Sequence, residues 1–188
     1  MSRLVIARLA GATLLGLVVV APVPAAAQSL AQRVSGAAAG PVQFLFPSRA
    51  DVCGNGRTWF SSGSNSWYGN FNGSGDAMRA ECQRGPVRVV LNRAGSEIVD
   101  INVFAGPEAP QEGIPNLGTV GGAEACEYQL SLAQRLEGKA GREAILPAMM
   151  AEGRPAGATT TLLAIARDDA RPRETRQSAM TWLGRLAD

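Results

Sequence analysis

The C-terminal stretch, residues 158–188, constrains the fold more than any other part of the chain. Its apolar residues recur at the spacing of an α-helix in two runs, separated by a polar turn at Asp168 and Asp169. The first run predicts a helix over residues 159–167. The second predicts a helix over residues 172–187, because the proline that opens it suits the first turn of a helix. Each helix has an apolar face to bury, so the pair must pack against another layer.

A weaker copy of this pattern precedes it, in residues 124–137 and 142–151. Apolar positions of the two copies align at offsets of 33 and 35 residues, which is a period typical of helical repeat proteins. Pro147 falls inside the second helix of the first copy, where it removes a hydrogen bond and predicts a kinked or short helix. The sequence therefore predicts two helical hairpins over residues 123–188.

The pattern L-x-I-A-R-D-D, followed by P-x-x-x-R-x-x-A-M-x-W-L-G, resembles a HEAT repeat of the short, phycobilisome-lyase-like type. The residues that carry the resemblance are Leu163, Ile165, Ala166, Asp169, Pro172, Arg176, Ala179, Leu183 and Gly184. The resemblance covers roughly the last third of the chain. It implies structural roles for Asp169 and Arg176, because the matching aspartate and arginine brace neighbouring repeats in that family. Family members are usually adaptors or scaffolds, and a few have lyase-type roles with bound chromophores.

Two repeats are fewer than a free-standing solenoid needs. About three or more are required to bury a continuous core in such proteins. We therefore expect either the N-terminal part of this chain or a partner to cover the stack.

The chain begins like an exported bacterial protein. Arg3 and Arg8 precede an uncharged apolar run, residues 9–21, and an A-x-A motif follows. We expect residues 1–27 to be a signal peptide that is cleaved after Ala27, which would place the protein in the periplasm or outside the cell. The run is shorter than the ~20 residues that a membrane-spanning helix requires. The alternative is a segment retained as an N-terminal anchor.

Charge and composition argue against several classes of function. The chain has 18 Lys and Arg residues against 16 Asp and Glu, and loss of Arg3 and Arg8 with the signal peptide leaves 16 of each. A balanced charge does not favour binding to nucleic acid or to an anionic membrane. Histidine is absent, which removes Ser-His and Cys-His catalysis and the usual zinc ligands.

The acidic residues give no stronger indication of catalysis. Two carboxylate pairs, Glu97 with Asp100 and Asp76 with Glu81, have the residue types for glycoside hydrolysis. Ordinary surface carboxylates explain both pairs better. We therefore expect a protein that is not an enzyme and that has no cofactor and no metal.

Three cysteines, Cys53, Cys82 and Cys126, follow the predicted signal peptide. Exported proteins meet an oxidising environment. Cys53 and Cys82 flank an unusual insert, and a disulfide between them would close a loop of about 30 residues and stabilise the fold by roughly 3–4 kcal/mol. Cys126 lies beside the apolar stripe of a predicted helix, so we expect a buried free thiol. The alternative pairs Cys126 with one of the other two cysteines.

Residues 54–75, within that loop, mix turn-forming and aromatic residues. Fifteen of the 22 are Gly, Ser or Asn, and five are aromatic. One interpretation is a surface for a glycan or peptide, with Trp59, Trp67 and Tyr68 as the ligand residues. We favour the other, a small β-meander whose aromatics fill its own core, because a stapled lobe needs something to bury. A calcium site over residues 70–76 is disfavoured, since the spacing matches no standard calcium loop.

Strand patterns surround this loop. Residues 42–46 form a short candidate strand, and residues 87–92 and 97–104 predict an antiparallel hairpin. Alternation in the second strand of the hairpin places Ile98 and Asp100 on one side, and Val99 on the other.

These patterns divide the chain into segments and give a fold class. We expect a flexible segment over residues 28–40, a β-rich lobe over residues 41–105 and a Pro/Gly-rich linker over residues 106–122. The predicted fold class is α+β: a small disulfide-stapled antiparallel β lobe followed by two HEAT-like α-helical hairpins.

These features favour an exported, non-enzymatic module for protein–protein interaction or scaffolding. The expected partner surface is the exposed edge of the last hairpin, at Arg173, Arg176, Gln177 and Met180. The alternative is a glycan- or peptide-binding protein that uses the aromatic loop, residues 54–75. The sequence does not identify the partner.

Overall fold

The computed structural model describes residues 28–57, 60–62, 67–69, 82–107 and 110–187. The helices are α1 (Leu30–Gly36), α3 (Gly122–Arg135), α4 (Gly138–Glu143), α5 (Ile145–Met150), α6 (Gly157–Arg167) and α7 (Arg173–Ala187). The strands of the larger sheet are β1 (Val42–Phe46), β5 (Val87–Ala94), β6 (Glu97–Ala105) and β7 (Asn116–Thr119). The strands of a smaller sheet are β2 (Val52–Cys53), β3 (Phe60–Ser62) and β4 (Trp67–Gly69).

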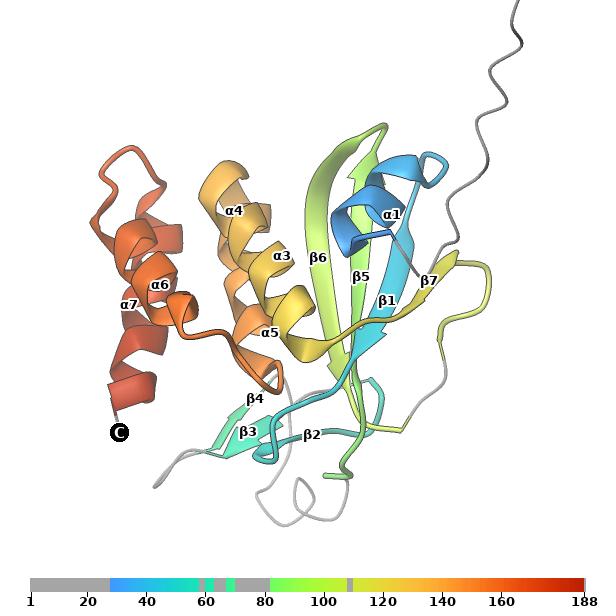
Figure 1. The fold of residues 1–188 in the computed structure, drawn as a ribbon, viewed down its shortest axis with the longest axis horizontal. Coiled ribbons are helices and arrows are strands. Elements are labelled where there is room, and N and C mark those ends of the chain that lie inside the picture. The colour runs from blue at the N-terminus through green and yellow to red at the C-terminus, as the bar shows by residue number, and fades with distance from the viewer. Residues whose placement is uncertain (1–27, 58–59, 63–66, 70–81, 108–109, 188) are drawn as a thin grey trace, which may run out of the picture.

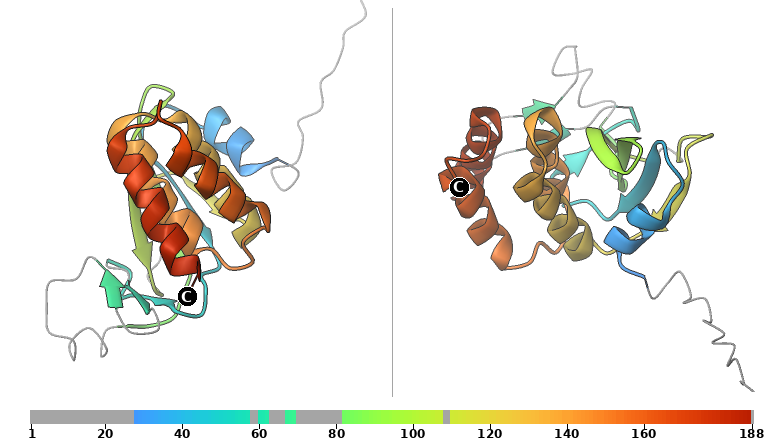
Figure 2. Two further views of the ribbon diagram at one scale, coloured as in Figure 1. Left: turned by 90° about the vertical axis from the view of Figure 1, so that its left-hand side faces the viewer. Right: turned by 90° about the horizontal axis from the view of Figure 1, so that it is seen from above.

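The larger sheet and helices α3 to α7 stack as three layers (Figure 1). Helices α3, α4 and α5 lie between the sheet and the outer pair, α6 and α7, and the view from above in Figure 2 shows the same order. A single hydrophobic core extends through all three layers, from Phe44 in the sheet to Trp182 in α7. The general α+β prediction is confirmed, with the β part and the helices sharing one core.

The larger sheet has the strand order β6-β5-β1-β7. The predicted hairpin is confirmed as the antiparallel pair β5 and β6, and β1 pairs antiparallel with β5. The prediction of a purely antiparallel lobe is wrong, because β7 pairs with β1 in parallel. Strand β7 belongs to residues 106–122, which we expected to be a linker. Its sequence, NLGT, has no apolar alternation, so tertiary contacts and not local pattern place it in the sheet.

A β-bulge changes the predicted faces of β6. Asn92 pairs with Asp100 and Arg93 pairs with Ile98, so Val99 is an extra residue on β6. Ile98 therefore lies in the core, while Val99 is 47% exposed.

The segment between β6 and β7 is fixed by a buried glutamine, Gln43 of β1. Its Nε2 donates to the carbonyl oxygens of Gln111 (2.6 Å) and Ile114 (2.8 Å), and its Oε1 accepts from the N–H of Gln111 (2.8 Å). Three hydrogen bonds satisfy this amide, so burial of Gln43 costs little free energy. The same contacts hold the supposed linker against the sheet.

A second fully buried glutamine, Gln129 of α3, lacks such partners. Neither Nε2 nor Oε1 of Gln129 has a hydrogen bond to any part of the chain that the structure describes. We expect Gln129→Met to raise the free energy of unfolding by about 1–2 kcal/mol, since it removes two unpaired buried polar atoms at similar volume. Chemical denaturation measures the change. Gln43→Met is the matched control and should lower stability, so a loss at both positions would contradict the prediction.

Residues 28–40, predicted to be flexible, instead contain α1. Ser29 and Gln32 form a capping box at its start, and Leu30 is buried in the core. The guanidinium of Arg93 then donates to four backbone carbonyl oxygens at and beyond the helix end, those of Val34, Ala37, Ala38 and Gly40. A residue distant in sequence, Arg93, therefore fixes the end of this segment.

Charged side chains from two helices form hydrogen bonds with backbone groups on both outer strands of the larger sheet. Arg33 of α1 donates to the carbonyl oxygen of Leu117 in β7 (2.8 Å). Glu143 of α4 accepts from the N–H of Ile101 in β6 (3.2 Å). Such contacts protect a sheet edge against pairing with another strand.

The smaller sheet is an antiparallel meander in the order β2-β3-β4. The predicted disulfide joins Cys53 to Cys82, with Cα atoms 5.1 Å apart, and the backbones of Gly54 and Gln83 pair beside it. The predicted disulfide is therefore confirmed, and the backbone pairing of β2, β3 and β4 is that of a meander. A core filled by the aromatic residues of this meander stays a prediction.

Helices α6 and α7 match the predicted second hairpin closely. The first copy differs, because its second helix is divided into α4 and α5 at Ala144. Pro147 explains the break: it has no N–H to bond to the carbonyl of Glu143, four residues earlier. The HEAT-like relation of the two copies stays a prediction. Among the described residues, no helix has the length and apolar character needed to span a membrane.

Candidate functional site

The turn between α6 and α7 is held by ion pairs that differ from those implied by the HEAT resemblance. Arg176 binds Asp169 within the same hairpin, at 2.5 Å. The contact to the preceding hairpin comes from Arg171, which lies 3.5 Å from Glu137 and 3.3 Å from Asp168. Asp169 and Arg176 thus stabilise their own turn, and Arg171, which the sequence pattern did not single out, links the two layers.

The outer pair of helices presents most of the predicted partner surface. Arg173, Gln177 and Met180 of α7 are exposed and recur at helical spacing along one side of the helix. The opposite side of α7, with Thr175 and Ala179, is buried against the middle layer. Arg176 does not belong to the exposed stripe, because it is half-buried and paired with Asp169.

Three further exposed residues extend this surface, Leu163 and Arg167 of α6 and Gly184 of α7. Leu163 of α6 is 38% exposed, because Ala158, Leu162 and Ile165 fill the core side of the helix. Gly184 of α7 is exposed, and a Cβ at this position would meet no atom within 4 Å. We name the set Leu163, Arg167, Arg173, Gln177, Met180 and Gly184 the outer face. Figure 2 shows α6 and α7 side by side as the outermost layer on that side of the protein.

The outer face is unusual in its exposed apolar groups. Met180 is 52% exposed, and the large hydrophobic residues exposed in the described part of the chain are Met180, Leu163 and Val99. Two of these three belong to the outer face, whereas Val99 lies on β6. The terminal layer of a helical stack normally has a polar outer surface for solubility. Exposed methionine and leucine at this position depart from that rule.

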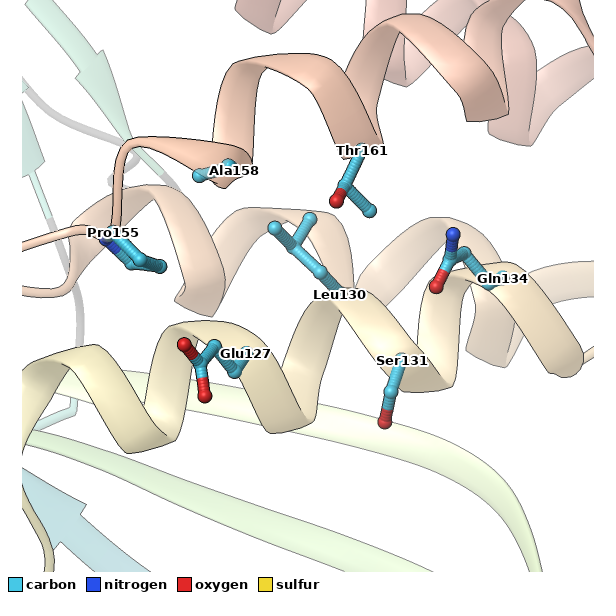
Figure 3. A pocket seen from close by; sticks show the side chains of 8 residues that line it. Glu127, Leu130, Ser131, Gln134, Pro155, Ala158 and Thr161 are labelled. Carbon is cyan, nitrogen blue, oxygen red and sulfur yellow. The ribbon is translucent and has the colours of Figure 1, made fainter.

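A groove lies between residues 127–134 of α3 and the start of α6 (Figure 3). Its volume is about 250 Å³, and Leu130, Pro155 and Ala158 give it an apolar side. Ser131, Gln134, Thr161 and Glu127 supply its polar groups. Among the described residues that line the groove, Glu127 is the only acidic one, so these residues offer no pair of groups for acid–base chemistry.

The alternative ligand surface cannot be built from the described side chains. Trp59 lies outside the described residues, as do Asp76 and Glu81. Trp67 and Tyr68 belong to β4, for which the structure gives the backbone path and pairing alone.

The remaining candidates for chemistry have structural surroundings. Lys139, together with Asn92 and Asn102, holds the pKa of Asp100 below its usual value, so Asp100 is unsuited to act as an acid. Burial raises the pKa of the Cys126 thiol to about 11, which keeps this free cysteine protonated and unreactive. Within the described ranges, no cluster of three His, Cys, Asp or Glu residues could hold a metal ion.

Comparison with known proteins finds no matching family model, no matching curated protein and no matching solved structure.

Proposed function

We propose that the protein is an exported, non-enzymatic module that binds another protein through its outer face. The observation that carries this proposal is the exposure of Leu163 and Met180 on the last layer of a helical stack. A partner that covers these side chains would remove apolar surface from water, which is a main source of affinity between proteins.

The HEAT-like pattern supports the same proposal. Stacked helical hairpins expose side chains on rigid elements, and repeat proteins bind macromolecules with such surfaces. The larger sheet covers one side of the middle layer, so the inner end of the stack is already closed. The outer end is the one at which a further layer, supplied by a partner, could be added.

An exported location fits the covalent structure. The Cys53–Cys82 disulfide is compatible with an oxidising compartment, and the N-terminal pattern is that of a cleaved signal peptide.

The test is a pull-down from the envelope extract of the source organism with the intact, oxidised protein. We expect Met180→Glu to reduce capture of the partner at least about tenfold, because it places a charge in a desolvated contact. Leu163→Glu should act in the same direction. Quantitative mass spectrometry of the retained proteins measures the loss.

The matched control is Val99→Glu, which changes a similarly exposed apolar residue on β6. Circular dichroism should show all three variants folded. A partner retained equally by Met180→Glu and Val99→Glu would contradict the assignment of the outer face.

A further inference from the structure

We infer that the partner presents an acidic helix to the outer face and that this helix packs closely over Gly184. The inference rests on the proposed function and adds the chemistry and shape of the partner. Two independent observations carry it: the charge of the outer pair of helices and a glycine that the fold itself does not require.

The charge of the outer pair favours an acidic partner. Residues 157–187 contain five arginines, Arg167, Arg171, Arg173, Arg176 and Arg185, against three acidic residues, Asp168, Asp169 and Glu174. Asp168 and Asp169 are already paired with Arg171 and Arg176. Arg167 and Arg173 are exposed and form no ion pair with the part of the chain that the structure describes. Carboxylates on a partner could form ion pairs with these two guanidinium groups, which lie on the outer face together with its apolar side chains.

Gly184 favours a partner whose backbone approaches α7 closely. Glycine inside a helix is less favourable than alanine, and Gly184 has neither a positive φ nor a neighbour that a side chain would strike. Gly122 and Gly141, by contrast, are required by backbone atoms within 2.1 and 2.3 Å of an added Cβ. Met180 lies one helical turn before Gly184, so the two create a step in the surface. A partner helix can approach α7 closely at such a step, as small residues permit between packed helices.

A second copy of this chain is a poorer occupant. Pairing of two outer faces would bring Arg167 and Arg173 of one copy near those of the other. Like charges across an interface are unfavourable.

The experiment uses the intact protein and two synthetic amphipathic helical peptides. Both peptides carry the same stripe of Leu and Ala; one has Glu at the flanking positions and the other has Lys. Titration is followed by NMR of the ¹⁵N-labelled protein. We expect the acidic peptide to bind about tenfold more tightly than the basic one, with shifts concentrated on α6 and α7, and added salt should weaken this binding.

Variants test the two parts of the inference separately. The double charge reversal Arg167→Glu with Arg173→Glu should abolish the preference for the acidic peptide, whereas Arg84→Glu, at an exposed loop position, should leave it intact. Gly184→Gln should raise the melting temperature, because it removes a helix glycine, and should nevertheless weaken binding. A merely structural Gly184 would not give this combination.

Several results would overturn the inference. The inference is contradicted if the two peptides bind equally, if neither binds, or if Gly184→Gln binds the acidic peptide as tightly as the natural sequence does. It is also contradicted if sedimentation shows a concentration-dependent dimer that Gly184→Gln abolishes. If any of these occurs while Met180→Glu still prevents capture from the extract, the acidic helix is wrong and the proposed function stands. If Met180→Glu leaves capture unchanged, the proposed function fails as well.

Discussion

Gly106→Ala is expected to lower the free energy of unfolding by about 3–5 kcal/mol, the largest effect of any single substitution considered. Gly106 has φ +113°, which residues with a Cβ rarely adopt, and an added Cβ would lie 2.5 Å from the carbonyl oxygen of Gly54. This carbonyl oxygen belongs to the backbone, so it cannot rotate away from the added Cβ as a side chain could. Since small domains are stable by only about 5–15 kcal/mol, the variant should be marginally folded. Urea denaturation followed by circular dichroism measures the loss.

Gly40→Ala is the matched control for this substitution. Gly40 has a nearly identical φ of +108°, but an added Cβ would meet no atom within 4 Å. It should therefore show the conformational cost alone, about 1–3 kcal/mol. Equal losses at the two glycines would mean that the crossing of Gly54 and Gly106 is not tightly packed.

The double variant Cys53→Ser with Cys82→Ser is expected to lose about 3–4 kcal/mol of stability. The disulfide joins residues 29 apart, and its main effect is to restrict the unfolded chain. The backbone pair between Gly54 and Gln83 survives the substitution, so the folded state should keep its structure. Thermal and urea unfolding of the oxidised protein and of the variant provide the comparison.

Reduction supplies the control for the disulfide. Unfolding of the natural sequence in the presence of a thiol reductant should coincide with unfolding of the double variant. The buried thiol of Cys126 should contribute equally to both. If the double variant were as stable as the oxidised protein, the disulfide would not stabilise the fold.

The elements that could be predicted from sequence are those whose signals are local. Helices α6 and α7 follow from apolar spacing and from the proline before α7, and the β5–β6 hairpin follows from two apolar runs with turn-forming residues between them. The disulfide followed from the change of composition between Cys53 and Cys82. In each case the residues that form the element also carry the pattern.

The elements that were missed depend on residues far away in the chain. Gln43 of β1 holds the segment before β7 against the sheet, and Arg93 of β5 fixes the end of α1. A local signal for α1 was present in the capping box of Ser29 and Gln32. No comparable signal marks β7, and the bulge at Val99 is visible only in the pairing of β5 with β6.

The candidate site was partly predictable for the same reason. Helical spacing places Arg173, Gln177 and Met180 together, but the exposure of Leu163 depends on which side of α6 meets the middle layer. The half-buried position of Arg176 depends on its pairing with Asp169. The sequence pattern therefore predicts the exposed stripe on α7. The surface that α6 and α7 share depends on how the two helices pack.

The position of β1 at the centre of the sheet sets an order on folding. Its partners are residues 87–91 of β5 and residues 116 and 119 of β7, so nothing close in sequence pairs with it. A chain that emerges from its N-terminus cannot complete this strand until most of the protein is available, because long loops must close first. The α6–α7 hairpin, by contrast, is made from neighbouring residues and can form as soon as its own segment is present. Formation of the α6–α7 hairpin therefore does not have to wait for the sheet to close.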